Sequence, residues 1–173
     1  MNLWLRLCWI WFRSRSAKKL SVLEHSKIDL LVCLNDLDVY GHLNNGRYLA
    51  LMDLGRIDLI WRSPLSKLVS ERRWYPLVAG VTIRYRRPLR LFQGFTLITR
   101  IASWDSKWIY VEQLFVYQGK AIARAIVRGI LRGPEDSIPT AQVLEAMGLD
   151  PAMPPPVDPS RFDELLNMSH VDR

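Results

Sequence analysis

The stretch that decides the fold runs from Asn35 to Asp58 and reads NDLDVYGHLNNGRYLALMDLGRID. Its first half collects acids, amides, a histidine and a glycine, and its second half opens a mostly apolar run without proline. The apolar residues of that run cover most of the circumference of an α-helix, which predicts a long helix buried on most sides. Asn44 or Asn45 stands where this helix begins, and asparagine is a preferred N-cap residue.

The polar residues ahead of the helix allow two interpretations. Asp36, Asp38 and a sharp reversal at Gly41 are sufficient for a capped turn with solvated acids. A catalytic site uses the same geometry, because free N–H groups at the N-terminus of a buried helix stabilise a developing oxyanion. An aspartate a few residues upstream then serves as general base or nucleophile. Local spacing leaves both interpretations open.

Strand patterns flank the predicted helix on both sides. Lys27–Leu34, ahead of it, is a β-branched and apolar run. Pro64 and a second short helix, closed by SERRWYP, follow the long one. Four strand-like runs come next, namely VAGVTIRYRRPL, GFTLITRIASW, KWIYVEQLFVYQG and KAIARAIVRGILRG. Because the links between the last runs are short turns, these strands are expected to pair antiparallel.

The run VAGVTIRYRRPL alternates between two faces, as a half-buried strand does. We expect a buried apolar face and an exposed polar one, namely Val81, Ile83 and Tyr85 against Thr82, Arg84 and Arg86. Gly80 and Gly129 lie inside strand patterns and permit the bends or bulges of a curved sheet. Since curling the sheet around the helix buries both most economically, the sequence predicts an α+β fold, a curved antiparallel β-sheet wrapped around a central long helix.

This fold is expected to occupy residues 27–133, between a Trp-rich basic N-terminal segment (1–26) and a helical, proline-rich C-terminal extension (134–173). In the extension, Thr140 is predicted to cap a short helix that ends at Gly148. DPAMPPPVDP then reads as an extended linker to a last short helix near SRFDELLNM.

Charge is concentrated at the N-terminus. Five of the seven net positive charges lie in the first twenty residues, which contain no acid. The rest of the chain is close to neutral, which argues against nucleic acid as the main partner. Cys8 and Cys33 show no metal or redox spacing, so we expect reduced thiols and no metal site.

The opening MNLWLRLCWIWFRSRSAKKL is too short an apolar run to span a bilayer and lacks the features of a signal peptide. Tryptophans beside arginines fit a helix at a membrane interface. The alternative is a terminal helix docked on the domain or on a partner subunit. We therefore expect a cytoplasmic protein with possible peripheral contact to the inner membrane through residues 1–20.

The stretch DLDVYGHLNNGRYLALMDLGR resembles the acyl-CoA thioesterases of the hotdog-fold superfamily, in the branch of 4-hydroxybenzoyl-CoA thioesterase. That branch carries an Asp, then Gly-His-x-Asn-Asn, then Tyr, then an acid and an Arg on the helix. The matching residues are Asp38, Gly41, His42, Asn44, Asn45, Tyr48, Asp53 and Arg56. The resemblance covers about Lys27 to Gly133 and implies a homodimer or homotetramer, with active sites at the subunit interface, that hydrolyses a fatty or aryl acyl-CoA.

The resemblance also implies residue roles. Asp38 is the expected catalytic carboxylate, and the backbone N–H groups around Gly46 and Arg47 are expected to polarise the thioester carbonyl. Around them, the implied substrate-binding residues are His42, Asn44, Asn45 and Tyr48, with Tyr48 packed beneath the site. Asp53 is a second candidate base, although an ion pair with Arg56 at spacing i, i+3 is its more ordinary role.

Coenzyme A is part of the substrate, so no separate cofactor is expected. Its phosphates need cations, and the candidates are Arg84, Arg86, Arg87 and Arg90, for each of which a solvated outer face is an equal alternative. For the acyl group the candidates are Leu49, Met52, Trp61 and Trp74. Two other functions remain open, a hotdog enoyl-CoA hydratase and a non-catalytic acyl-CoA-binding or lipid-binding module.

Overall fold

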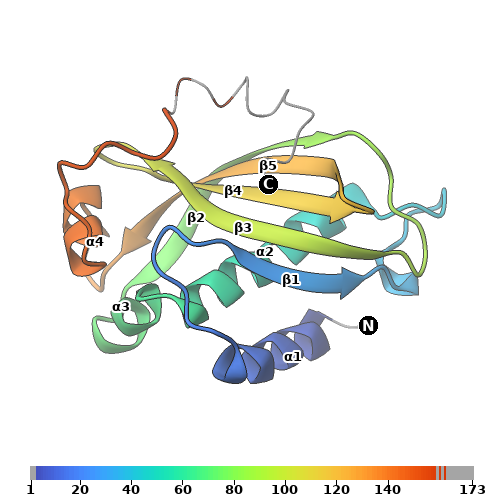
Figure 1. Ribbon diagram of the computed structural model, residues 1–173, viewed down its shortest axis with the longest axis horizontal. Helices are drawn as coiled ribbons and strands as arrows, with labels where there is room; N and C mark the ends of the chain where they lie inside the picture. Colours follow the sequence, from blue (N-terminus) through green and yellow to red (C-terminus); the bar gives the residue numbers. More distant parts are fainter. Residues whose placement is uncertain (1–2, 159, 161, 163–173) are drawn as a thin grey trace.

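The computed structural model describes residues 3–158, 160 and 162 (Figure 1). The last short helix expected near 160–168 therefore lies largely outside the described residues. In chain order the elements are α1 (Leu3–Ser16), β1 (Ser26–Leu31), the 3₁₀ turn η1 (Leu34–Asp36), α2 (Asn45–Arg62), α3 (Leu65–Glu71), β2 (Tyr75–Tyr85), β3 (Gly94–Trp104), β4 (Ile109–Tyr117), β5 (Lys120–Arg132), β6 (Ser137–Ile138) and α4 (Thr140–Ala146).

The central helix α2 forms where the sequence predicted it. Asn44 is its N-cap, and its side chain accepts a hydrogen bond from the N–H of Gly46. A glycine in mid-helix normally costs stability, but at Gly55 a β-carbon would stand 2.5 Å from Thr99 Oγ1 and 2.9 Å from Gln113 Nε2. Gly55 therefore lets α2 approach β3 and β4 closely.

The sheet is antiparallel throughout and curls around α2 (Figure 1). Its strand order is β1-β3-β4-β5-β2, with β6 added to β5. The register shifts between Val78 and Gly80, and a β-carbon at Gly129 would come within 2.8 Å of the Leu77 carbonyl oxygen. The predicted curved sheet around a long helix is confirmed, and both glycines lie at irregular or crowded positions of the β2–β5 pair.

Three local expectations are wrong. β1 ends at Leu31 rather than at Leu34, because the chain turns into η1. Val81 and Tyr85 are each 39% exposed instead of buried, because β2 is the last strand of the sheet and pairs on one side only among the described residues. Thr140 is the first residue of α4 and not its cap, which is Pro139 without a side-chain hydrogen bond.

Helix α1 packs against α2. Its Ile10 is fully buried in the core cluster that α2 and the sheet form. This contact brings the N-terminal segment onto the fold (Figure 1). In the described part of the chain, no helix combines the length and the apolar character needed to cross a bilayer.

Candidate active site

The loop between η1 and α2 holds Asp38 in a fixed position. One oxygen of its carboxylate, Oδ1, accepts hydrogen bonds from the N–H groups of Tyr40 (2.9 Å) and His42 (3.1 Å). The Asp38 N–H donates to the His42 carbonyl at 2.8 Å, and Gly41 has a φ of +75°, which a glycine adopts without strain. The carboxylate is half-buried. The loop thus forms a tight turn that keeps one acid beside the start of α2.

The first turn of α2 offers fewer free donors than the sequence suggested. The Gly46 N–H donates to Asn44 Oδ1 at 2.8 Å, and the Arg47 N–H donates to the Asn44 carbonyl at 2.9 Å. The first N–H groups of a helix have no partner inside it. Among the described residues, the Asn45 N–H has no hydrogen-bond partner and is therefore the open donor at this end.

Tyr48, near the start of α2, packs against two aromatic rings. Its ring lies 4.9 Å from that of Tyr85 and 4.8 Å from that of Phe115, and only 2% of the residue is exposed. Burial raises the pKa of the Tyr48 hydroxyl to about 12, with a smaller contribution from Tyr85. Tyr48 is thus a neutral packing residue, while the Tyr85 hydroxyl donates to the Asn45 carbonyl at 3.4 Å.

Asp36, the last residue of η1, is buried, whereas Asp38 in the loop is half-buried. The Asp36 carboxylate accepts hydrogen bonds from Arg6 at 2.5 Å, Arg47 at 2.8 Å and the Cys33 N–H at 2.9 Å. Burial alone would raise the pKa of Asp36, but the hydrogen bonds from Arg6, Cys33 and Arg47 outweigh it, and the pKa lies below its ordinary value. The Arg47 side chain is therefore committed to Asp36 and not directed at a substrate.

Asp53 forms the expected ion pair with Arg56, and Arg56 also donates to Gln113 Oε1 at 2.7 Å. Burial lowers the pKa of the Arg56 guanidinium, and the neighbouring Asp53 carboxylate opposes that shift. The Asp53 side chain remains 57% exposed. Its carboxylate is thus oriented by Arg56 yet open to solvent.

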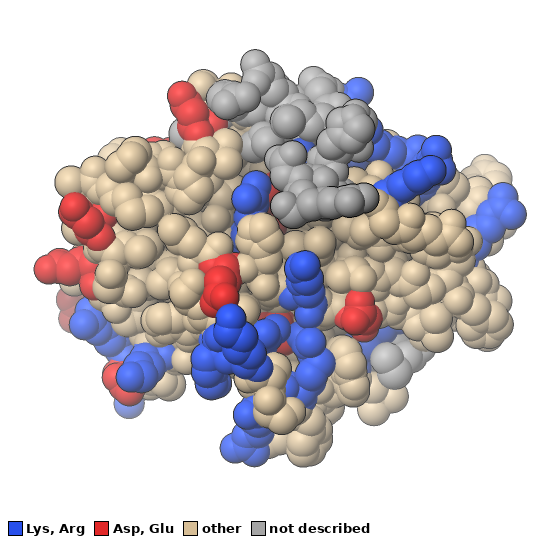
Figure 2. All heavy atoms as spheres, viewed as in Figure 1, with Lys and Arg blue, Asp and Glu red and all other residues tan. Residues whose placement is uncertain are grey.

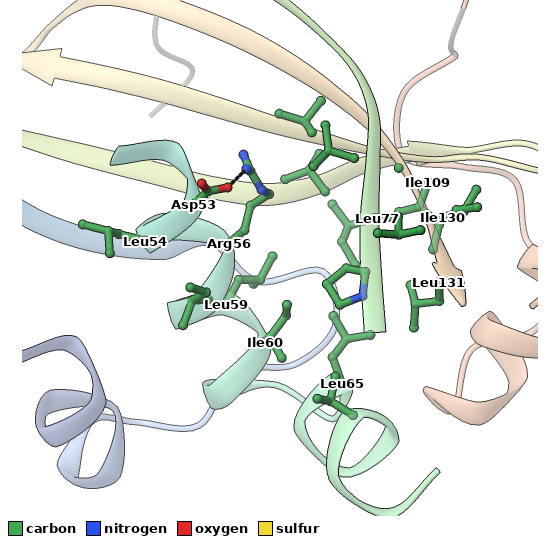
Figure 3. A pocket seen from close by; sticks show the side chains of 18 of the residues that line it. Asp53, Leu54, Arg56, Leu59, Ile60, Leu65, Leu77, Ile109, Ile130 and Leu131 are labelled. Atoms are coloured by element: carbon green, nitrogen blue, oxygen red, sulfur yellow. Dashed lines mark hydrogen bonds and ion pairs between the residues drawn. The ribbon is translucent and has the colours of Figure 1, made fainter. Parts of the chain in front are cut away.

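Asp53 and Arg56 are the charged residues on an otherwise apolar pocket of about 350 Å³. Figure 3 shows side chains of α2 on one side of it and side chains of β2, β4 and β5 on the other. Its apolar lining includes Leu3, Trp4 and Leu7 of α1 together with Leu54, Ile57, Ile60, Leu77, Val78, Ile109, Val127 and Ile130.

The pocket differs from the sequence expectation in two respects. Leu49, Met52, Trp61 and Trp74 do not line it. Met52 and Trp74 are buried in the cores, and Leu49 is 42% exposed. Asp38 does not line the pocket either. Asn45 and Asp53 are eight residues apart on α2, about 12 Å along the axis. The Asp38 loop therefore lies at the N-terminus of α2, and the pocket lies about two turns further along the same helix.

A second, smaller pocket of about 220 Å³ is basic and adjoins the Asp38 loop. Arg87, Arg90 and Lys120 line it, and a β-bridge joins Arg90 to His42. Arg84 and Arg86, also predicted to bind phosphate, are exposed on and just after β2 outside this pocket. Sequence reasoning missed Lys120, because its turn at the start of β5 meets the segment after β2 only in the folded sheet.

An antiparallel sheet curled around a central helix, with an Asp and a Gly-His-x-Asn-Asn loop at the helix start, defines a hotdog-fold protein of the thioesterase class. The family model described as "Thioesterase-like superfamily" matches residues 32–148, and the chain belongs to this family.

Three known proteins illustrate the relationship. Protein THEM6 of Danio rerio is 37% identical over 120 residues, which are 68% of this chain and 59% of that protein. Long-chain acyl-CoA thioesterase FadM of Escherichia coli is 28% identical over 93 residues, 53% of this chain and 70% of FadM. The crystal structure of the probable thioesterase YbaW from Escherichia coli superposes with a TM-score of 0.65 at 22% identity, over 70% of this chain and 95% of that one. The matched region thus spans about three fifths of the Danio rerio relative.

Proposed function

We propose that this protein hydrolyses acyl-CoA thioesters to the free acid and CoA, with Asp38 as the general base or nucleophile. The observation that carries the proposal is the Asp38 carboxylate, fixed by two backbone N–H groups directly ahead of a buried helix. Membership of the thioesterase-like superfamily supports the same reaction class.

In the general-base form, Asp38 takes a proton from a water molecule whose oxygen attacks the thioester carbonyl carbon. The carbonyl oxygen becomes an oxyanion beside the N-terminus of α2, where the Asn45 N–H and the helix dipole stabilise it. Collapse of the tetrahedral species breaks the C–S bond, and the CoA thiolate receives the proton held by Asp38. In the nucleophile form, an Asp38 oxygen attacks the carbonyl carbon instead, the C–S bond breaks and the CoA thiolate leaves. Water then hydrolyses the acyl–Asp38 anhydride to the free acid and the Asp38 carboxylate, and the remaining proton goes to the thiolate.

The order of features along the molecule agrees with the order of groups in an acyl-CoA. The basic pocket with Arg87, Arg90 and Lys120 suits the phosphates of CoA, and it adjoins the Asp38 loop through His42. The apolar pocket begins about two turns further along α2 and suits the acyl chain. Its volume of about 350 Å³ lies within the usual range of small-ligand pockets. A fatty acyl group is therefore the proposed substrate, in keeping with the name of the FadM relative.

We further propose a homodimer formed through β2. Among residues 3–158 this strand pairs along one edge only, and it carries five large apolar side chains with exposures of 39% to 49%, namely Tyr75, Leu77, Val78, Val81 and Tyr85. A long apolar edge strand is a template for pairing with another chain. Since Leu77 and Val78 also line the acyl pocket, a second copy would help to close it. Light scattering after gel filtration should give twice the chain mass, and Val81→Lys should halve it.

The reaction is tested by measuring thiol release from acyl-CoAs of increasing chain length, by wild type, Asp38→Asn and Asp53→Asn. Both substitutions preserve shape, so circular dichroism should be unchanged. We expect Asp38→Asn to lower kcat by at least about 100-fold, the usual contribution of a general base. Asp53→Asn is the matched control, and its kcat should stay within about tenfold of wild type. A kcat that falls by about 100-fold in Asp53→Asn but not in Asp38→Asn would instead identify Asp53, in the acyl pocket, as the general base.

A binding module is the second candidate. It is favoured by one observation, namely that Asn44 already occupies the Gly46 and Arg47 N–H groups, as in an ordinary capped turn. Wild type that binds acyl-CoA by calorimetry but releases no thiol from any chain length would establish this second function and reject hydrolysis.

A further inference from the structure

Helix α1 presents an almost wholly apolar surface to solvent. We call this surface the outer face; it consists of Trp4, Leu5, Cys8, Trp9, Trp11 and Phe12. Trp4, Leu5 and Phe12 are 71%, 61% and 66% exposed. Contiguous exposed apolar patches on soluble proteins mark surfaces that meet a partner or a membrane.

Two of the three arginines of α1 point the other way, toward the protein. Arg6 is fully buried and pairs with Asp36, and Arg13 pairs with Asp58, whose side chain is also fully buried. Two buried carboxylates therefore fix the rotation of α1 about its axis. A helix that only covered a core would turn its aromatic residues inward and its arginines outward. In this helix Arg6 and Arg13 face the protein beside Ile10, whereas the aromatic residues remain exposed, so the fold holds the aromatic face outward.

Basic side chains border the outer face. Arg15, Lys18 and Lys19 are exposed at its C-terminal end, and the first twenty residues contain no acid. The Arg15 guanidinium lies 4.2 Å from the centre of the Trp11 ring, and Lys18 pairs with Glu24. In the view of Figure 2, Lys and Arg side chains gather over the lower part of the molecule, where Figure 1 places α1. Tryptophan beside basic residues is the composition that binds an anionic lipid surface.

We propose that the outer face of α1 docks on an anionic lipid bilayer and holds the mouth of the apolar pocket against it. Trp4 belongs to both features, since it is 71% exposed and also lines the pocket together with Leu3 and Leu7. An acyl chain dissolved in the bilayer thus enters the pocket past the first turn of α1. This second part rests on the proposed thioesterase function, whereas the docking itself does not.

The helix lies on the bilayer surface and does not cross it. Its 14 residues extend about 21 Å, and the hydrocarbon core of a bilayer is about 30 Å thick. Its rotation, fixed by Asp36 and Asp58, leaves one face for lipid. Aromatic rings on that face are then expected at the level of the headgroups.

The docking is tested with the full chain and sedimentable vesicles of phosphatidylcholine, with and without 30% phosphatidylglycerol (about a third, enough for an anionic surface). We expect pelleting with the anionic vesicles, weakened by salt, and quenching of tryptophan fluorescence by brominated acyl chains. The test variant is Leu5→Ser with Phe12→Ser, two exposed positions that do not line the pocket. It should lower the partition coefficient by at least about tenfold. Leu5→Ile with Phe12→Leu is the matched control and should bind as wild type.

A second copy of the chain is the competing occupant of the outer face. If wild type fails to pellet, and the Leu5→Ser, Phe12→Ser variant forms a smaller oligomer in lipid-free buffer, the face is a protein interface and the proposal is overturned. Equal pelleting of wild type and the Leu5→Ser, Phe12→Ser variant also overturns the proposal, because the surface that binds the vesicles then lies elsewhere.

Entry of substrate from the bilayer is measured separately. Wild type and the serine variant are given a long-chain acyl-CoA embedded in anionic vesicles, or a short-chain acyl-CoA in solution. The variant should lose at least about tenfold of the vesicle-borne turnover and none of the soluble turnover, in line with its partition coefficient. Equal losses on both substrates would refute the entry route. Absence of hydrolysis in wild type would refute the thioesterase function while leaving the vesicle-binding result intact.

Discussion

Replacing Arg6 by methionine should destabilise the protein strongly, because it leaves the buried carboxylate of Asp36 without its main partner. Arg6 donates to both oxygens of Asp36, at 3.1 Å and 2.5 Å, and to the Leu31 carbonyl at 2.8 Å. Removing one partner of a buried ion pair costs about 3–5 kcal/mol. Arg47 and the Cys33 N–H still bind Asp36 in the variant. We therefore expect the free energy of unfolding to fall by about 3 kcal/mol, near the lower limit of that range.

The measurement is urea unfolding of wild type, Arg6→Met, Asp36→Asn and the double variant, all at one protomer concentration. Because both single variants break the same pair, the double variant should cost at least about 1 kcal/mol less than the sum of the two. Lys18→Met is the matched control. Its pair with Glu24 is solvent-exposed, at 77% and 41%, so its loss should not exceed about 1 kcal/mol. A loss below about 1 kcal/mol for Arg6→Met would refute the idea that this ion pair anchors α1.

Three further predictions concern the helix start, the helix–sheet contact and acid stability. Asn44→Ala removes the cap on Gly46 and should cost about 1 kcal/mol, a drop in Tm of about 2–4 °C by calorimetry. Gly55→Ala forces a β-carbon against Thr99 and should cost about 1–3 kcal/mol in urea, a result that a loss near zero would contradict. Since the folded-state pKa of Asp36 is lowered, its contribution to stability is complete above the unfolded pKa of about 3.9 and is lost as pH falls below it. Unfolding titrations from pH 6 to pH 3 should therefore show a steeper decline for wild type than for Asp36→Asn.

Much of the fold follows from local sequence. The helix Asn45–Arg62 was predictable because its apolar period, its asparagine cap and the absence of proline all agree within one short stretch. The antiparallel pairing of β3 with β4 and of β4 with β5 was also predictable, because a short turn between adjacent strands leaves them no other geometry. The resemblance around Asp38 likewise depends on residues close together in the chain.

The candidate site was only partly accessible to such reasoning. The sequence indicated Asp38 and the helix start, but it did not show that Asn44 would occupy the Gly46 and Arg47 N–H groups. It assigned the acyl group to Leu49 and Met52 among others, whereas the pocket begins further along α2, at Asp53, and its other walls come from β2, β4 and β5. Which stretch of a mostly apolar helix lines a pocket depends on what packs against it, and the period alone cannot supply that.

By itself, then, the sequence determined the elements, their antiparallel links and the polar loop before α2, because each of these depends on neighbours within a few residues. Only the tertiary structure decided that β2 pairs with β5, that Lys120 joins Arg87 and Arg90, and that Arg6 binds Asp36 thirty residues away. In α1, two buried carboxylates hold Arg6 and Arg13 toward the protein, and Trp4, Trp9 and Trp11 remain exposed.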